Sequence, residues 1–100
     1  MSKYSMTGKL IAQPGKREEL AHILLQAAQG LEDNEDCQLY LVNLDENNPD
    51  AIWVMELWTS AEAHAQSLKN PSTVALIQGA RPLIAGIEPI KLRPVGGKGY

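Results

Sequence analysis

Cysteine and histidine are scarce in this sequence, and their scarcity excludes several kinds of site. The one cysteine, Cys37, cannot form an intramolecular disulfide or half of a CxxC metal-binding motif. The two histidines, His22 and His64, stand far apart and belong to different expected elements. We therefore expect neither a disulfide nor a bound metal.

Basic residues do not outnumber acidic ones. The chain has nine Lys and Arg residues and 12 Asp and Glu residues, which give a formal net charge of −3 at pH 7. Nucleic-acid binding needs a clustered basic excess, so we exclude it. No apolar run approaches the ~20 residues that cross a bilayer, and the first ten residues lack the apolar stretch of a secretory signal. We expect a cytoplasmic protein that does not bind membranes.

Apolar residues are plentiful enough for one folded core. The chain has 100 residues, of which 44% are hydrophobic and 21% are charged. A chain of this length hides roughly 60–70% of its unfolded surface on folding. No repeat, low-complexity segment or linker divides it. We predict a single domain over residues 1–100.

Residue patterns predict four strands and three helices. A capping box at 59–62 opens one short helix, Asn70-Pro71 opens the next, and Gly86 closes that region. Alternating or continuous apolar runs predict strands, and an apolar stripe predicts the first helix. The expected strands are 4–12, 37–44, 51–59 and 87–95, and the expected helices are 16–31, 60–69 and 71–81.

The order of these elements defines the fold class. Their order is strand, helix, strand, strand, helix and strand, with the second helix in two pieces. This is the ferredoxin-like β-α-β-β-α-β pattern of the α+β class. Pro89 agrees with this assignment, because proline is tolerated in a strand at a sheet edge, where the last strand of this topology lies.

Strands 37–44 and 51–59 are apolar on both faces. Helices of this fold cover only one face, so the other would expose a large apolar patch, which monomers rarely tolerate. A second copy packed sheet against sheet is the simplest cover. We therefore predict a homodimer.

Glu56 interrupts the apolar run WVMELW. Burying a carboxylate without a partner costs several kcal/mol or raises its pKa. A cross-strand partner such as Lys9 or Tyr40 is one interpretation, and a polar anchor in a pocket is the other.

His64 shares a helical stripe with Ala61, Ala65 and Leu68, which turns it inward. It is either a packed core residue or a general base. Trp58 shares a strand face with Glu56 and leads into this helix, whereas Trp53 lies on the opposite face.

Glu56, Trp58 and His64 are therefore expected to surround one cavity as candidate catalytic residues. Tyr40 joins them as a candidate substrate-binding residue if the hairpin pairs residue 40 with residue 56.

Three stretches of this sequence together resemble the antibiotic biosynthesis monooxygenase family. They are PGK-x-E-E-L, the long segment MELWTSAEAHAQSLKNPSTVALIQGARPLIAG and the later PVGGKG. The sequence is most similar to bacterial proteins labelled quinol monooxygenases. The resemblance implies a dimeric α/β barrel made by two facing sheets, with one pocket per subunit. It also implies oxidation of a small phenol or quinol by O2 without metal, haem or flavin. In that reaction His64 would hold the proton, Trp58 would pack the ring and Glu56 would orient polar groups.

Two departures from the family narrow this expectation. Polyketide-modifying members carry an Asn where this chain has Val54, and haem-degrading relatives carry a His where it has Ser67 or Leu68. Haem degradation is therefore disfavoured. The same fold also hosts small-molecule isomerases and members without demonstrated activity. We expect a cofactor-free monooxygenase, with an isomerase and a non-catalytic dimeric binding module as the alternatives.

Overall fold

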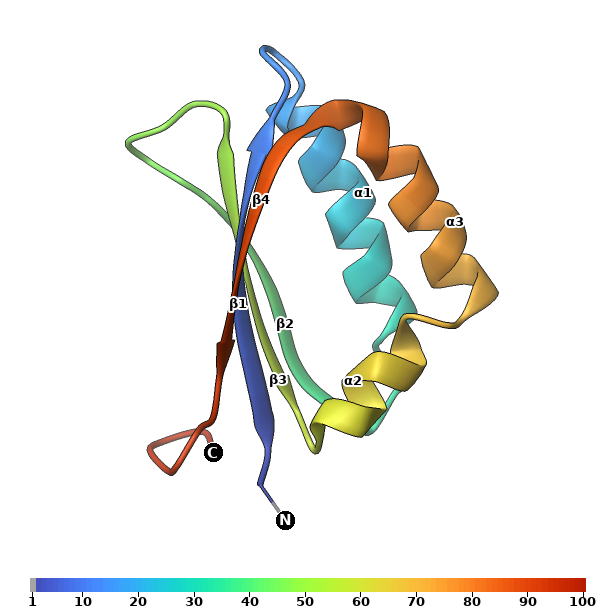
Figure 1. Cartoon of the computed structure of the whole chain (residues 1–100), viewed down its shortest axis with the longest axis vertical. Helices are drawn as coiled ribbons and strands as arrows, with labels where there is room; N and C mark the ends of the chain where they lie inside the picture. Colours follow the sequence, from blue (N-terminus) through green and yellow to red (C-terminus); the bar gives the residue numbers. More distant parts are fainter. Residues whose placement is uncertain (1) are drawn as a thin grey trace.

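The computed structural model describes residues 2–100 as one antiparallel sheet with its helices gathered on one face (Figure 1). This arrangement confirms the predicted ferredoxin-like α+β fold. The elements in chain order are β1 (Tyr4–Ala12), α1 (Arg17–Gly30), β2 (Cys37–Leu44), β3 (Ala51–Trp58), α2 (Ala61–Ser67), α3 (Pro71–Ala80), the 3-10 turn η1 (Arg81–Leu83) and β4 (Ile84–Leu92).

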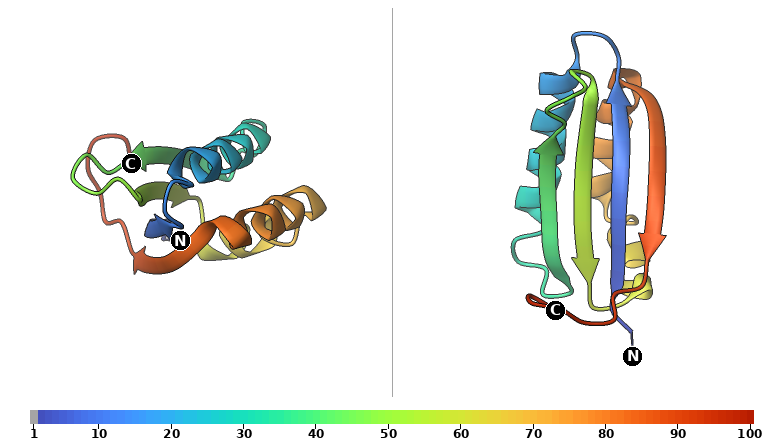
Figure 2. Two further views of the ribbon diagram at one scale, coloured as in Figure 1. Left: turned by 90° about the horizontal axis from the view of Figure 1, so that it is seen from above. Right: turned by 90° about the vertical axis from the view of Figure 1, so that its left-hand side faces the viewer.

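The strands lie in the order β2-β3-β1-β4, and every neighbouring pair is antiparallel (Figure 2). β4 is an edge strand, as Pro89 predicts. Its bounds differ from the predicted 87–95, because Pro82 in η1 already ends the helical segment and Ile84 pairs with Ala12. The prediction that Gly86 precedes this strand is therefore wrong, since Gly86 lies within it.

Side-chain caps begin the two short helices. The Ser60 hydroxyl accepts a hydrogen bond from the Ala63 amide at 3.1 Å, so Ser60 caps α2. The predicted capping box began one residue too early, because the Thr59 hydroxyl instead bonds the Asp36 carboxylate at 2.8 Å. Asn70 caps α3 as predicted, accepting from the Ser72 amide at 2.9 Å.

The core lies between the sheet and the helices. The even-numbered residues of β3 and the apolar stripe of α1 meet there, as the helical spacing predicts. Leu20 and Ile52 are completely buried, and α3 contributes Ala80. Of residues 2–100, no helix is both long and apolar enough to cross a bilayer.

The other side of the sheet, which we call the outer face, has no helix over it (Figure 1). The odd-numbered residues of β3, Trp53, Met55 and Leu57, lie on this face in the register of the sheet. Met55 is 42% exposed although it sits in the centre of an interior strand. Both faces are thus apolar, and only one is covered within the chain.

Candidate active site

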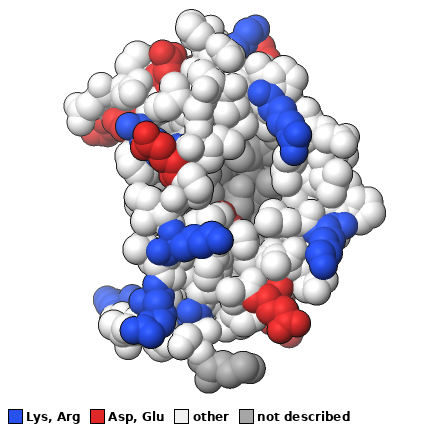
Figure 3. Space-filling model, in the orientation of Figure 1, with Lys and Arg blue, Asp and Glu red and all other residues white. Residues whose placement is uncertain are grey.

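A cavity of about 230 Å³ lies between the sheet and the three helices. Figure 3 shows the molecule hollowed between these layers, with a small acidic area inside the hollow. Aliphatic side chains from α1 and α3 form most of its wall. The side chains with polar atoms that line it are those of Tyr40, Glu56, Trp58, His64, Ser67 and Thr73.

The strand register places the strand residues of this site. Tyr40 of β2 pairs directly with Glu56 of β3, so the two share the inner face. Met6 of β1 pairs with Glu56 on its other side, and Lys91 of β4 pairs with Met6. These four residues form one row across the sheet, facing the helices. The hairpin thus pairs residue 40 with residue 56, which is the condition under which Tyr40 is expected to join Glu56.

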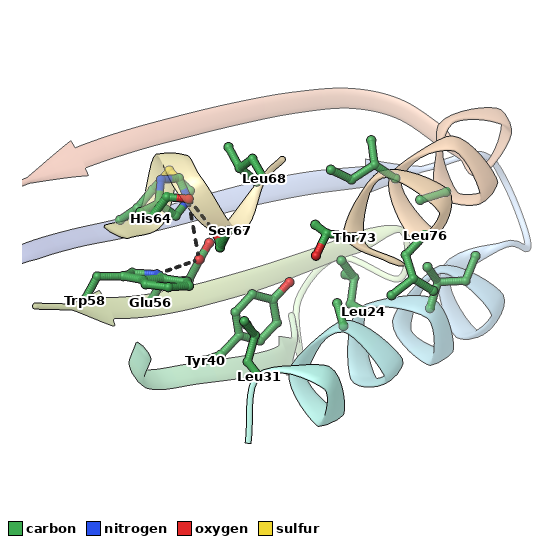
Figure 4. Close-up of a pocket in the computed structure, with 15 residues that line it drawn as sticks. Leu24, Leu31, Tyr40, Glu56, Trp58, His64, Ser67, Leu68, Thr73 and Leu76 are labelled. Atoms are coloured by element: carbon green, nitrogen blue, oxygen red, sulfur yellow. Dashed lines mark hydrogen bonds and ion pairs between the residues drawn. The ribbon is translucent and has the colours of Figure 1, made fainter. Parts of the chain in front are cut away.

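Glu56 is the acidic group at the centre of the site. Its side chain is 9% exposed, and its Oε1 accepts a hydrogen bond of 3.0 Å from Nε1 of the buried Trp58. The same oxygen lies 3.7 Å from Nε2 of His64 on α2 (Figure 4). The three residues proposed from the sequence are thus in direct mutual contact.

The predicted Lys9 partner of Glu56 is wrong. Lys9 pairs with Trp53 on the outer face, and its amine lies 5.5 Å from the centre of the Trp53 ring. Glu56 instead takes its hydrogen bond from Trp58, two residues along the same strand and so on the same side of the sheet. Opposite Glu56 on β2 lies Tyr40, the other cross-strand partner expected from the sequence.

Aromatic rings hold His64 in position. The Trp58 ring meets the imidazole edge-on, with centroids 5.4 Å apart, and the Tyr4 ring lies 5.0 Å away. The Ser67 hydroxyl donates to the His64 carbonyl at 2.6 Å. The predicted inward orientation of His64 is confirmed, because its imidazole lies against Trp58 and Glu56.

Burial shifts both ionisable groups toward their neutral forms. It raises the pKa of the Glu56 carboxyl above its usual value, and the hydrogen bond from Trp58 offsets part of that rise. Burial, and after it the charge of Lys91, lowers the pKa of His64. A histidine with a lowered pKa is neutral near pH 7 and can accept a proton.

Burial also keeps Tyr40 in its neutral form. Burial, reinforced by the nearby Glu56 carboxylate, raises the pKa of its hydroxyl well above the usual value of 10.0. The hydroxyl therefore stays protonated and serves as a hydrogen-bond donor or acceptor. Within residues 2–100, no group of three or more His, Cys, Asp or Glu side chains is arranged to hold a metal ion.

Thr73 is a cavity residue that the sequence analysis missed. The sequence does contain a pattern that indicates Thr73. Thr73 lies in a stripe at helical spacing with Leu76, Ile77 and Ala80, and it is the one polar residue of that stripe. His64 stands out in its own stripe for the same reason. Met6 was missed as well, because only the strand pairing places it beside Glu56.

The fold and this cavity define a class: a ferredoxin-like domain with a largely apolar cavity between sheet and helices. The family model for antibiotic biosynthesis monooxygenases matches residues 4–78. The chain belongs to the antibiotic biosynthesis monooxygenase family.

Solved structures agree with this assignment. A protein of Chloroflexus aurantiacus J-10-fl named "putative Antibiotic biosynthesis monooxygenase" is 42% identical, with 96% of each chain covered and a TM-score of 0.86. One of the same name from Caulobacter crescentus CB15 is 22% identical over 95% of this chain and 92% of its own, with a TM-score of 0.89, and shows the fold alone. No curated protein matches.

Proposed function

We propose that this protein is a monooxygenase that oxidises a small phenol or quinol with O2 and no bound cofactor. One observation carries the proposal: a buried histidine with a lowered pKa lies 3.7 Å from a buried carboxylate, at one end of an apolar cavity. The named relative from Chloroflexus aurantiacus supports the same reaction class.

The first step is the removal of a proton from a ring hydroxyl of the substrate. His64 accepts this proton, and the Glu56 carboxylate stabilises the imidazolium that forms beside it. Trp58 fixes the carboxylate oxygen by its 3.0 Å hydrogen bond, so Glu56 needs no rearrangement when the charge appears. Direct two-electron reaction of triplet O2 with a closed-shell molecule is spin-forbidden. Deprotonation makes the ring electron-rich enough to pass a single electron to O2 instead, which avoids this restriction.

Electron transfer and bond formation then follow on the substrate. The phenolate gives one electron to O2, and the resulting radical pair joins to form a carbon–oxygen bond. The peroxide takes the proton held by His64. Loss of the ring C–H proton and of hydroxide then leaves a quinone carbonyl and one water. The substrate supplies all four electrons, so no external reductant is consumed.

The size and lining of the cavity fit an aromatic substrate. An apolar cavity of about 150 Å³ is large enough for benzene, and this one measures about 230 Å³. It therefore holds one ring with substituents or two fused rings. Most of its wall is aliphatic, with Leu24 and Leu76 opposite the strands (Figure 4), which suits an apolar ring.

Oxygen uptake tests this function. The purified protein is mixed with a panel of quinols and polycyclic phenols in an oxygen electrode, and His64→Gln serves as the inactive control. We expect uptake that depends on both substrate and enzyme. Conversion of a substrate without oxygen would instead identify an isomerase, and binding without conversion would identify a binding module.

We further propose that the protein acts as a homodimer in the cytoplasm, joined through the outer face. The loop between β2 and β3 and the segment after β4 project on this side, one at each end of the sheet (Figure 1). The sheet surface between them is the proposed contact area. Its exposed large apolar residues are Leu39, Leu41, Met55, Ile90 and Leu92.

A further inference from the structure

Tyr4, the first residue of β1, lies against His64 but is not among the residues that line the cavity. It pairs with Trp58 of β3, so both rings stand on the inner face of the sheet. The centroid of the Tyr4 ring lies 5.0 Å from that of the imidazole. Tyr4 therefore reaches the cavity through the side chains it contacts, above all that of His64.

The two aromatic rings meet the imidazole in different ways. Trp58 meets it edge-on, with an angle of 72° between the ring planes, whereas the plane of Tyr4 is tilted by 34° and is closer to parallel. The face of an aromatic ring is its electron-rich side, and it attracts a cation within about 6 Å of the ring centroid. The imidazole becomes such a cation when it takes a proton. The Tyr4 ring therefore favours the protonated form of His64.

The Tyr4 ring is itself held in place. Tyr4 belongs to β1, which lies between β3 and β4 in the sheet. Its hydroxyl donates a hydrogen bond of 3.6 Å to the sulfur of Met6, the residue that pairs with Glu56. A ring fixed at both the backbone and the hydroxyl is a constant part of the surroundings of His64.

Other titratable groups also act on His64. Those that the sheet presents on its inner side at this end are Tyr4 (β1), Cys37 and Tyr40 (β2), Glu56 (β3) and Lys91 (β4). Burial raises the pKa of both tyrosine hydroxyls and of the thiol, so these three groups stay neutral near pH 7. The Glu56 carboxylate at 3.7 Å favours a charged imidazole, and the Lys91 ammonium disfavours it. The ring of Tyr4 thus acts with Glu56 and against Lys91.

We propose that Tyr4 is a positioning residue for His64, and that its ring, rather than its hydroxyl, stabilises the imidazolium. A base that is buried among apolar side chains loses affinity for protons, and the ring restores part of it without adding a charge. This role rests on the proposed function, because it takes His64 as the base that removes the proton from the substrate.

An NMR titration of His64 tests the role without turnover. The chain has two histidines, and His22, exposed on α1, is a reference in the same sample. Tyr4→Leu removes the ring, so the pKa of His64 should fall by about 0.5 pH unit. If the ring only covered His64, the change would have the opposite sign, because water admitted to the imidazole relieves its burial and raises its pKa. The direction of the change therefore separates the two roles.

Further variants assign the effect to the ring. Tyr4→Phe keeps the ring and removes the hydroxyl, so it should leave the pKa of His64 within about 0.2 pH unit of that of the unaltered protein. Tyr100→Leu is the matched control, because Tyr100 lines a hollow with Leu39 and Leu57 on the outer face. Circular dichroism reports folding, and Tyr4→Met, with an unbranched apolar side chain, takes the place of Tyr4→Leu if that variant does not fold.

Two results would overturn the inference: an unchanged or raised pKa of His64 in the variant without the ring, or an equal fall in Tyr4→Phe. Oxygen uptake is measured separately, and Tyr4→Leu should turn over about 10-fold more slowly than Tyr4→Phe. Equal uptake by these two variants would refute the positioning role. If the pKa falls as expected but the unaltered protein consumes no oxygen, the effect of the ring on His64 stands and the proposed function alone is wrong.

Discussion

The two faces of β3 differ in what covers them and in where their polar groups lie. On the inner face Ile52 is 0% exposed and Glu56 is 9% exposed, whereas Met55 on the outer face is 42% exposed. The inner face encloses a carboxylate and an imidazole within an apolar wall. The outer face has the exposed Met55 at its centre, and its charged residues Lys9 and Glu88 stand opposite one another in neighbouring strands, beside Trp53.

This difference separates two tasks that one sheet performs. A concave, closed surface with a few polar groups suits a small molecule. A broad, uncovered apolar surface suits another protein surface. Substitutions on the inner face should therefore alter chemistry, and those on the outer face should alter assembly. Each of the following predictions tests that division.

Replacement of His64 should have the largest effect. His64→Gln removes the base but keeps a polar side chain of similar reach, so turnover per folded molecule should fall roughly 10²–10⁴-fold. Steady-state oxygen uptake measures the loss, and circular dichroism confirms folding. His22→Gln, a change at the exposed histidine of α1, should leave turnover unchanged. Equal turnover in His64→Gln and the unaltered protein would show that His64 has a packing role and is not the base.

A charge on the outer face should break the dimer without closing the cavity. Met55→Lys places an ammonium in the centre of the proposed interface, and an unpaired buried charge costs about 3–5 kcal/mol. Because a symmetric dimer would bring two such charges into the interface, sedimentation should show the dimer dissociation constant rising by at least about 10²-fold. Leu25→Lys is the control, because Leu25 is equally apolar and exposed but lies on α1. A monomeric unaltered protein would refute the assignment of this face.

Removal of the charge of Glu56 should have a smaller effect than removal of the base. Glu56→Gln retains an oxygen to accept from Trp58 but no longer stabilises the imidazolium. Turnover should fall about 10-fold, with melting temperature little changed. Glu62→Gln on the exposed side of α2 tests for general effects of charge removal. A loss as large as that of His64→Gln would make Glu56 the base itself.

The pH profile should shift by a few tenths of a unit when one nearby charge is removed. His64 works as a base only when unprotonated, so kcat/KM should rise with pH. Its midpoint should lie below the usual 6.5, since burial and Lys91 lower the pKa of His64. Lys91→Gln should move the midpoint upward, and Lys16→Gln, on the far end of α1, should not move it. A midpoint above 6.5 would contradict the assigned environment.

Chelation should have no effect at all. The proposed reaction uses no metal, so incubation with EDTA followed by gel filtration should leave oxygen uptake unchanged. Metal analysis of the active protein provides the control. If activity were lost on chelation and restored by one particular metal, the reaction would depend on that metal and the cofactor-free mechanism would be wrong.

The sequence predicted correctly those features that follow from the repeat period of a helix or a strand alone. Helical stripes turned Leu20 and His64 inward, and the parity of residues 56 and 58 put Glu56 and Trp58 on one face. These inferences need only the periods of a helix and a strand. They account for the fold and for most of the candidate site.

The remainder depends on contacts between elements. From the sequence, Lys9 and Tyr40 are both possible cross-strand partners of Glu56, because sequence alone does not fix the strand registers. The observed registers place Lys9 on the outer face and Tyr40 opposite Glu56. The start of β4 at Ile84 follows from its pairing with Ala12. Thr73 was missed because a lone threonine in a helix acquires meaning only when the cavity beside it is known.

The most direct test of the central claim is the fate of the two atoms of O2. The phenol or quinol that gives the fastest uptake is oxidised under ¹⁸O2, and the product and water are analysed by mass spectrometry. The mechanism predicts one ¹⁸O atom in each product molecule and the other in water, with one O2 consumed per product. A product without label, whether from simple oxidation or from water attack, would contradict it.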